Sequence, residues 1–242
     1  MPEQTSSGGR DSQLIRWSDA TRFIRQLSHD LRNDLNAIEL QSAYLSELET
    51  NEEAKSEIKR LRTIVSGLAA TLQGLSRLVG DVRLNLIPYP AGDFVEDLRS
   101  QIKRGLAKES AEISWDVQLA ESILNIDPQL LQEVFIELVT NAFRHDRGQG
   151  PLIATAKTEN NEFFFTLEEP KTRVVSSVEN WGREPLRNMS QRHYGLGLNR
   201  ARAIVEAHGG QLRARYDENI SALVTTLILP TSPSSAKPAS NL

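Results

Sequence analysis

Residues 127–145 read DPQLLQEVFIELVTNAFRH, and this stretch decides the fold of the second half of the chain. Asp127 followed by Pro128 is typical of a helix start, because aspartate caps free backbone N–H groups and proline fits the first helical turn. At roughly 100° per residue, one face of this helix collects six apolar side chains: Leu131, Val134, Phe135, Leu138, Val139 and Ala142. The stretch therefore predicts an amphipathic helix, ending near His145, whose apolar face packs against a core.

The segments around this helix alternate between short strands and further helices. Strands are expected at 112–117, 122–126, 153–158, 163–168, 211–216 and 222–229. One helix is expected over 92–107, and another runs from near Leu196 to a glycine stop at Gly209 and Gly210. Helices on one side of a mixed sheet would make this half of the chain an α/β sandwich of the α+β class.

A polar stripe lies beside the apolar face of the central helix. It consists of Glu137, Asn141 and Arg144, and this combination suits a hydrated Mg²⁺ together with phosphates. A solvated flank on an ordinary amphipathic helix would explain the same stripe. Residues 137–145, however, resemble the N-box of the ATP-binding fold shared by histidine kinases, gyrase and mismatch-repair ATPases. The resemblance implies that Asn141 ligates Mg²⁺ and that Arg144 and His145 contact ATP. Glu137 stands where the ATPases keep a water-activating glutamate.

A second nucleotide-binding motif is expected where the last helix begins. The loop consists of Tyr194, Gly195, Leu196, Gly197 and Leu198. Its two glycines let backbone N–H groups approach a phosphate at a helix N-terminus, where the helix dipole favours anions. A plain tight turn would use the same residues. The position of the loop, directly before an apolar helix, resembles the G2-box of the same family, which implies contacts with ATP.

The adenine-binding motif of that family is incomplete in this chain. The family expects Asp-x-Gly-x-Gly after the strand at 163–168, with an aspartate that binds the adenine amino group. Here residues 168–173 read EEPKTR. Strand alternation puts Glu169 in the place of the aspartate, and both glycines are missing. Lys171 and Thr172 add side chains where the adenine ring would pack.

The first half of the chain reads as two long helices. From Ile58 onward, apolar residues are spaced alternately three and four apart over four heptads, at 58, 61, 65, 68, 72, 75, 79 and 82. The earlier stretch follows the same rule less strictly, at 24, 27, 31, 38, 45 and 48. Residues 49–52 suit the turn between the helices. Two helices cannot close a core alone, so we expect a hairpin that forms a homodimeric four-helix bundle.

One histidine of the first helix is a candidate nucleophile. With Leu27 and Leu31 on the heptad seam, His29 points away from the core, and Asn33 is its neighbour four residues later. Asp30 follows His29 directly. A solvated surface histidine is the ordinary interpretation. A neutral imidazole is nevertheless a competent nucleophile when a carboxylate holds the proton of its other nitrogen.

Residues 27–36, LSHDLRNDLN, resemble the H-box of sensor histidine kinases. The resemblance implies that His29 accepts a phosphoryl group and that Asp30 is the base beside it. Asn33 matches the position that orients phosphate or water and serves phosphatase activity on the partner, a response-regulator receiver domain. Asp34 stands where the family often has proline, so the usual helix kink is not expected here.

The chain is expected to divide into four segments. These are a disordered N-terminus at 1–12, a helical hairpin at 13–87, an ATP-binding domain at 91–230 and a disordered tail at 231–242. Prolines at 88 and 90 separate the two folded segments. The expected architecture is a dimerising helical hairpin followed by an α/β sandwich of the histidine kinase and gyrase ATPase type.

Composition narrows the class of protein. A net charge of −4 opposes nucleic-acid binding, which usually needs a basic face. No apolar run approaches the ~18 residues of a membrane span. The absence of cysteine excludes disulfide scaffolds, thiol catalysis and cysteine zinc sites. We therefore expect a cytoplasmic protein.

Three functions fit these motifs. The first is a histidine kinase that phosphorylates His29 from ATP and Mg²⁺ and passes the phosphoryl group to a response-regulator aspartate. The second is a histidine phosphotransferase or pseudokinase with a decayed nucleotide domain, in which His29 carries phosphate without ATP; the degenerate segment around Glu169 favours it. The third is a helical scaffold, or an ATP hydrolase that uses Glu137.

Overall fold

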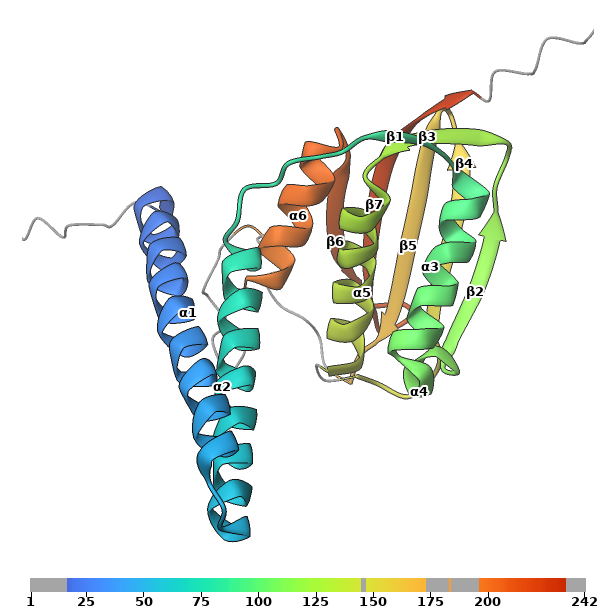
Figure 1. The fold of residues 1–242 in the computed structure, drawn as a ribbon. Coiled ribbons are helices and arrows are strands. Elements are labelled where there is room, and N and C mark those ends of the chain that lie inside the picture. Colours follow the sequence, from blue (N-terminus) through green and yellow to red (C-terminus); the bar gives the residue numbers. More distant parts are fainter. Residues whose placement is uncertain (1–16, 145–146, 173–182, 184–195, 234–242) are drawn as a thin grey trace, which may run out of the picture. The chain divides into compact units, whose positions relative to one another are not determined.

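The structure is a computed structural model that describes residues 17–144, 147–172, 183 and 196–233. The chain forms two compact units, Met1–Gly80 and Asp81–Leu242. The first unit is helical and the second is built on a β-sheet, as Figure 1 shows. The expected fold class, a helical N-terminal region followed by an α/β sheet domain, is confirmed. Within the described residues, no helix combines the length and apolar character that crossing a bilayer requires.

The first unit is an antiparallel hairpin of two long helices, α1 (Trp17–Leu48) and α2 (Glu52–Leu78) (Figure 1). The turn between them is capped by its own side chains. Asn51 accepts hydrogen bonds from the backbone N–H groups of Glu53 and Ala54, at 2.8 and 3.3 Å. Glu49 accepts from two backbone N–H groups of the same turn. The two helices and the turn expected from the sequence are therefore confirmed.

The contact between the two helices differs from the single heptad seam that we expected. The buried residues are Thr21, Ser28 and Ser42 of α1 and Val65 of α2. Half of the apolar residues of the expected seam are exposed in the single chain: Leu27, Leu31, Ile38, Leu45, Leu48, Leu61 and Leu68. Half of the expected seam is therefore not covered by the other helix of the hairpin.

The second unit contains a seven-stranded mixed sheet in the order β1-β3-β7-β5-β4-β2, with β6 paired to β7. The strands are β1 (Ile87–Pro90), β2 (Ile113–Gln118), β3 (Ser122–Ile126), β4 (Leu152–Glu159), β5 (Glu162–Pro170), β6 (Gln211–Asp217) and β7 (Ala222–Pro233). Only β2 and β4 pair in parallel among the described strands. The turn between β4 and β5 has positive φ at Asn160 and Asn161, which asparagine tolerates well.

Three helices cover one face of this sheet: α3 (Ala91–Gly105), α5 (Pro128–Arg144) and α6 (Gly197–Ala207) (Figure 1). A short helix, α4 (Ala107–Ser110), follows α3. The core between the two layers is aromatic at its centre. Phe135 of α5 meets Phe94 of α3 and Phe165 of β5, with ring centroids 5.7 and 4.4 Å apart. The expected strands and helices of this half are present, and α5 spans the predicted residues to within one position.

Two boundaries in the structure differ from the expected ones. Helix α2 ends at Leu78, and residues from Asp81 onward belong to the second unit, whereas the hairpin was expected to run to residue 87. The proline-containing stretch, which was expected to separate the folded segments, forms strand β1, which pairs with β3 at the edge of the described sheet. Proline is tolerated there because an edge strand leaves one row of N–H groups out of the ladder.

The C-terminal boundary also moves. Strand β7 continues past residue 230 to Pro233, because β3 pairs with residues 231–233. The first three residues of the expected tail are therefore part of the sheet. The expected disordered segment at 1–12 lies outside the described residues, as does the tail beyond 233.

Candidate functional site

The first candidate site lies on α1, where His29 is 67% exposed at its side chain. Asp30, the next residue, has its Oδ1 atom 3.2 Å from His29 Nδ1 and is itself 58% exposed. The imidazole is therefore open to solvent and to a large substrate, while one of its nitrogens has a carboxylate partner. The other nitrogen, Nε2, has no hydrogen-bond partner among the described residues.

Asn33 also lies near the imidazole, with its amide nitrogen 3.5 Å from His29 Nδ1. The two neighbours of Nδ1 make opposite demands, since a carboxylate needs a proton on Nδ1 and an amide N–H needs a lone pair there. We assign the proton to Nδ1, because Asp30 is the closer neighbour and carries a charge. In that tautomer Nε2 keeps the lone pair that a nucleophile requires.

Gln26 is a neighbour of this pair that the sequence analysis missed. Its Nε2 atom donates to Asp30 Oδ1 at 2.9 Å. The hydrogen bond from Gln26, followed by that from His29, holds the pKa of Asp30 below its usual value. The signal was present in the sequence, because residues four apart on a helix face one another.

The second candidate site lies on α5, where Asn141 and Glu137 form one hydrogen-bonded pair. Asn141 donates its amide N–H to Glu137 Oε1 at 2.9 Å, and both residues are half-buried. Asn141 Oδ1 is then the atom that would meet a cation. Arg144 is exposed in the last turn of the same helix, and His145 lies outside the described residues.

Glu137 also lies against the start of α6. Leu196, the N-cap of this helix, is buried, and Gly197 begins it. A Cβ atom at Gly197 would overlap the Glu137 carboxylate, so the carboxylate keeps this position only beside glycine and would otherwise turn aside. The carboxylate thereby comes to the positive end of the helix dipole. Tyr194 and Gly195, the first part of the predicted loop, lie outside the described residues.

A second contact joins α5 to α6 one turn away. Arg200 Nε lies 3.7 Å from Glu133 Oε2. Leu198 packs against the core beside these residues. The polar stripe of α5 therefore faces the first turns of α6, which the sequence analysis had placed in separate motifs.

Glu169, the residue in the place of the adenine-binding aspartate, is buried near the end of β5. It forms an ion pair with Lys171, and the two side chains are 8% and 6% exposed. Burial raises the pKa of Glu169 to about 7, while the hydrogen bond and charge of Lys171 act in the opposite direction. The carboxylate that was expected to receive an adenine amino group is therefore already paired with a cation of its own chain.

The segment that follows α5 is hydrogen-bonded to the end of β5, beside this ion pair. Gly148 N–H donates to Pro170 O at 2.7 Å, and a Cβ at Gly148 would contact the backbone of Lys171. Arg147 forms an ion pair with Glu112 at 2.7 Å. The end of β5 and the segment after α5 thus hold one another in place.

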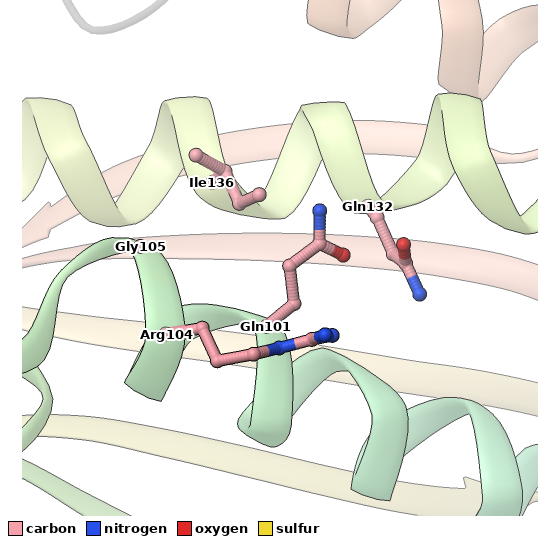
Figure 2. Close-up of a pocket in the computed structure, with 5 residues that line it drawn as sticks. All are labelled: Gln101, Arg104, Gly105, Gln132 and Ile136. Carbon is pink, nitrogen blue, oxygen red and sulfur yellow. The ribbon is translucent and has the colours of Figure 1, made fainter.

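A shallow pocket lies elsewhere on the helical layer, between α3 and α5 (Figure 2). Its lining residues are Gln101, Arg104, Gly105, Gln132 and Ile136. Gln132 and Ile136 occupy a different flank of α5 from Glu137 and Asn141, since each residue turns the helix by roughly 100°. This pocket is therefore separate from the polar stripe.

The described residues contain no cluster of three or more histidine, aspartate or glutamate side chains that would hold a metal ion by itself. A magnesium ion does not need one, because it keeps several waters and binds proteins through one or two oxygen ligands plus the phosphates of a substrate. Asn141 Oδ1 and the adjacent Glu137 carboxylate provide one or two such oxygen ligands. These two residues would hold the ion.

Comparisons with known proteins find similar sequences and similar folds. Residues 126–233 match the model of the histidine kinase-, DNA gyrase B- and HSP90-like ATPase family. Over 234 residues the chain is 26% identical to an uncharacterized sensor-like histidine kinase of Rhizobium meliloti (strain 1021), covering 90% of this chain and 44% of the relative. It is 24% identical to the sensor histidine kinase HprS of Escherichia coli (strain K12), covering 81% and 44%. The chain thus spans less than half the length of these two relatives.

Solved structures show the same fold. The structure of full-length ShkA in complex with AMPPNP has a TM-score of 0.67 at 18% identity, covering 89% of this chain and 47% of ShkA. The histidine kinase ThkA in complex with the response regulator TrrA has a TM-score of 0.53 at 16% identity, covering 90% and 64%. Residues 126–233 thus form a domain of the histidine kinase-, DNA gyrase B- and HSP90-like ATPase family, and the chain as a whole is similar to sensor histidine kinases.

Proposed function

We propose that this chain is an ATP-dependent kinase that phosphorylates its own His29 and passes the phosphoryl group to an aspartate of a response regulator. The observation that carries the proposal is the exposed His29–Asp30 pair, whose geometry leaves Nε2 as the nucleophilic nitrogen. The same chain also contains an ATPase-type domain, which would bind the phosphoryl donor, ATP.

The proposed transfer is a displacement at the γ-phosphorus of ATP. The lone pair of His29 Nε2 forms the new P–N bond, while the bond from the γ-phosphorus to the bridging oxygen breaks and ADP leaves with that electron pair. The ring then carries a positive charge and a proton on Nδ1. Asp30 stabilises that charge and accepts the proton, because its Oδ1 already contacts Nδ1. In the second step, the regulator carboxylate attacks the phosphorus, Asp30 returns the proton to Nδ1, and the neutral imidazole leaves with the electron pair of the P–N bond.

The nucleotide would bind at the polar stripe of α5 and the start of α6. Asn141 Oδ1 would ligate Mg²⁺, which when bound neutralises the charge that develops on the phosphates. Backbone N–H groups at the N-terminus of α6 would receive phosphate oxygens, and Arg144 is exposed on the same stripe. The binding of AMPPNP by ShkA, whose fold this chain shares, supports a nucleotide at this domain.

The hairpin would work as a homodimer. Seven apolar residues of the expected seam remain 38% or more exposed in the single chain: Leu27, Leu31, Ile38, Leu45, Leu48, Leu61 and Leu68. A second copy of the hairpin would bury them in a four-helix bundle. His29 would stay outside such a core, because it lies on a different face from Leu27 and Leu31. The complex of ThkA with TrrA supports a receiver domain as the other partner.

One observation favours a second candidate, a phosphotransferase that does not use ATP. The Glu169 carboxylate is paired with Lys171 inside the protein, so an adenine amino group would have to share it with an ammonium group of the same chain. In that case His29 would shuttle phosphate between regulators. The surviving Glu137–Asn141 pair favours the kinase, because a decayed site has no need to keep it.

Incubation of the chain with Mg²⁺ and γ-³²P-ATP tests the proposal. A kinase acquires label that survives base and is lost in acid, as expected of phosphohistidine, and His29→Ala abolishes it. A phosphotransferase stays unlabelled with ATP but accepts label from a phosphorylated receiver domain. Release of phosphate that persists in His29→Ala and stops in Glu137→Ala would identify a hydrolase and contradict the proposal. Circular dichroism of the variants controls for folding.

A further inference from the structure

A short hydrogen-bonded row runs along the exposed face of α1 from Gln26 to the candidate nucleophile. Gln26 Nε2 donates to Asp30 Oδ1 at 2.9 Å, and that same oxygen lies 3.2 Å from His29 Nδ1. Asp30 Oδ1 is therefore the partner of both Gln26 Nε2 and His29 Nδ1. The position of that oxygen relative to the imidazole depends on a residue one helical turn earlier.

An aspartate on a solvated helix face has several rotamers available, and only some of them bring its carboxylate to the next residue. Nothing buries Asp30, since its side chain is 58% exposed. The hydrogen bond from Gln26 is therefore a restraint that selects the rotamer in which Oδ1 meets Nδ1. The lowered pKa of Asp30, for which Gln26 is the largest cause, agrees with a carboxylate held in its ionised form.

We propose that Gln26 is a positioning residue for the phosphorylation of His29: it holds the Asp30 carboxylate where it fixes the proton on Nδ1 and leaves Nε2 unprotonated. This inference rests on the proposed function for the role of His29. Gln26 itself touches neither the imidazole nor the phosphoryl group. It acts through Asp30.

The competing arrangement is present in the same structure. Asn33 places its amide nitrogen 3.5 Å from Nδ1, where it would donate to an unprotonated Nδ1. If Asp30 turned away, Asn33 and water would favour the proton on Nε2, and the nucleophilic lone pair would be lost. Gln26 therefore favours Asp30 over Asn33 as the hydrogen-bond partner of His29 Nδ1.

The test uses the full chain and potassium phosphoramidate, a donor that phosphorylates histidine without ATP or the nucleotide domain. In Gln26→Ala we expect the initial rate of phosphorylation of His29 at pH 7 to fall by about threefold to tenfold, the value of one hydrogen bond to a charged group at an exposed site. ¹⁵N NMR of the imidazole should show the proton moving from Nδ1 toward Nε2. An unchanged circular dichroism spectrum would show that this change in tautomer does not come from unfolding of the helix.

Two further substitutions separate positioning from a structural role. Gln26→Lys keeps a donor one turn before Asp30 and should recover most of the rate and the Nδ1–H tautomer. Gln26→Glu removes the donor, adds a like charge and should lower the rate furthest. Gln41→Ala changes an exposed glutamine of the same helix, about four turns away, and should match the wild type.

A wild-type tautomer and rate in Gln26→Ala would overturn the inference, as would failure of Gln26→Lys to recover either. Failure of the proposed function looks different. If wild-type His29 accepted no phosphoryl group from phosphoramidate, ATP or a phosphorylated receiver domain, the kinase proposal would fall, while the NMR measurement would still decide whether Gln26 sets the tautomer.

Discussion

Gly197, the first residue of α6, lies so close to the Glu137 carboxylate of α5 that no side chain fits between them. Sixty residues separate the two in the sequence. Their contact brings a negative charge to the N-terminus of a helix and fixes the distance between the two elements that carry the predicted nucleotide-binding motifs. The most direct predictions follow from this contact.

Gly197→Ala should weaken nucleotide binding and cost little stability. The added Cβ overlaps only the end of the Glu137 side chain, which is flexible and can turn aside, but the carboxylate then leaves the start of α6 and its place beside Asn141. Thermal unfolding and calorimetry with AMPPNP measure the two effects. Gly92→Ala is the matched control, because a Cβ at that helical glycine has open space around it, and its stability should stay equal or rise slightly. Equal behaviour of the two variants would refute the role of the Glu137 contact.

Asn141→Ala should abolish autophosphorylation of His29 and leave dimerisation intact. Without the amide oxygen the proposed Mg²⁺ ligand is lost, and we expect the labelling rate with γ-³²P-ATP to fall by about a hundredfold or more. Gln132→Ala, on the flank of α5 that lines the pocket in Figure 2, should keep the wild-type rate. Retained labelling in Asn141→Ala would contradict the assignment of the metal ligand.

Lys171→Ala should destabilise the second unit at pH 8. Without the ammonium group, which lowers the pKa of Glu169, the buried carboxyl must take up a proton or stay charged without a partner. We expect the free energy of unfolding in urea to fall by about 3 kcal/mol or more. Lys157→Ala, which removes a lysine paired with Glu159 on the surface, should leave the free energy of unfolding nearly unchanged. Unchanged stability in Lys171→Ala would show that this ion pair contributes nothing to folding.

The stability of the protein should carry a pH dependence that comes from Glu169. Its folded-state pKa, raised by burial to about 7 from an ordinary 4.5, means that the folded protein binds the proton more tightly. The contribution of Glu169 to stability is therefore complete below pH 4.5 and is lost as the pH rises to about 7. Relative to Glu169→Gln, the wild-type free energy of unfolding should fall by up to about 3 kcal/mol across this window. Urea unfolding at several pH values measures it, and a constant difference would contradict the buried state of the carboxyl.

Leu61→Asp should dissociate the proposed dimer. The side chain of Leu61 is 48% exposed in the single chain and would be buried by a second hairpin, where a carboxylate is costly. We expect the dissociation constant to rise by about a hundredfold, as measured by analytical ultracentrifugation. Ile220→Asp is the control, because Ile220 is 53% exposed but lies in the second unit. A dimer of unchanged affinity in Leu61→Asp would exclude this face as the interface.

Features that depend on near neighbours in the chain could be predicted from the sequence. Asp127 caps α5 by accepting a hydrogen bond from the backbone N–H of Leu130 at 3.1 Å, as its position before Pro128 indicates. Gly209, with φ of +73°, ends the last helix where the sequence placed a stop. Caps, turns and helical periodicity act over about four residues, so the sequence contains all the information they need.

Some errors arose where a local pattern has two tertiary solutions. The heptads of α1 and α2 predict a seam, but small residues such as Ser28 and Ser42 face the partner helix within the hairpin. The prolines at 88 and 90 predict a break, but an edge position lets them join the sheet. Which face of a helix meets which neighbour depends on how the whole surface is buried, and periodicity does not encode that.

The sequence by itself determined the elements, their order, the exposed His29–Asp30 pair and the polar stripe that contains Glu137 and Asn141. Only the tertiary structure decided that Glu137 meets Gly197 and that the ion pair of Glu169 and Lys171 is buried. The physical reason is the range of the forces involved: backbone hydrogen bonds and helical faces are set within a few residues, whereas burial and close approach are set by segments that meet only when the chain has folded.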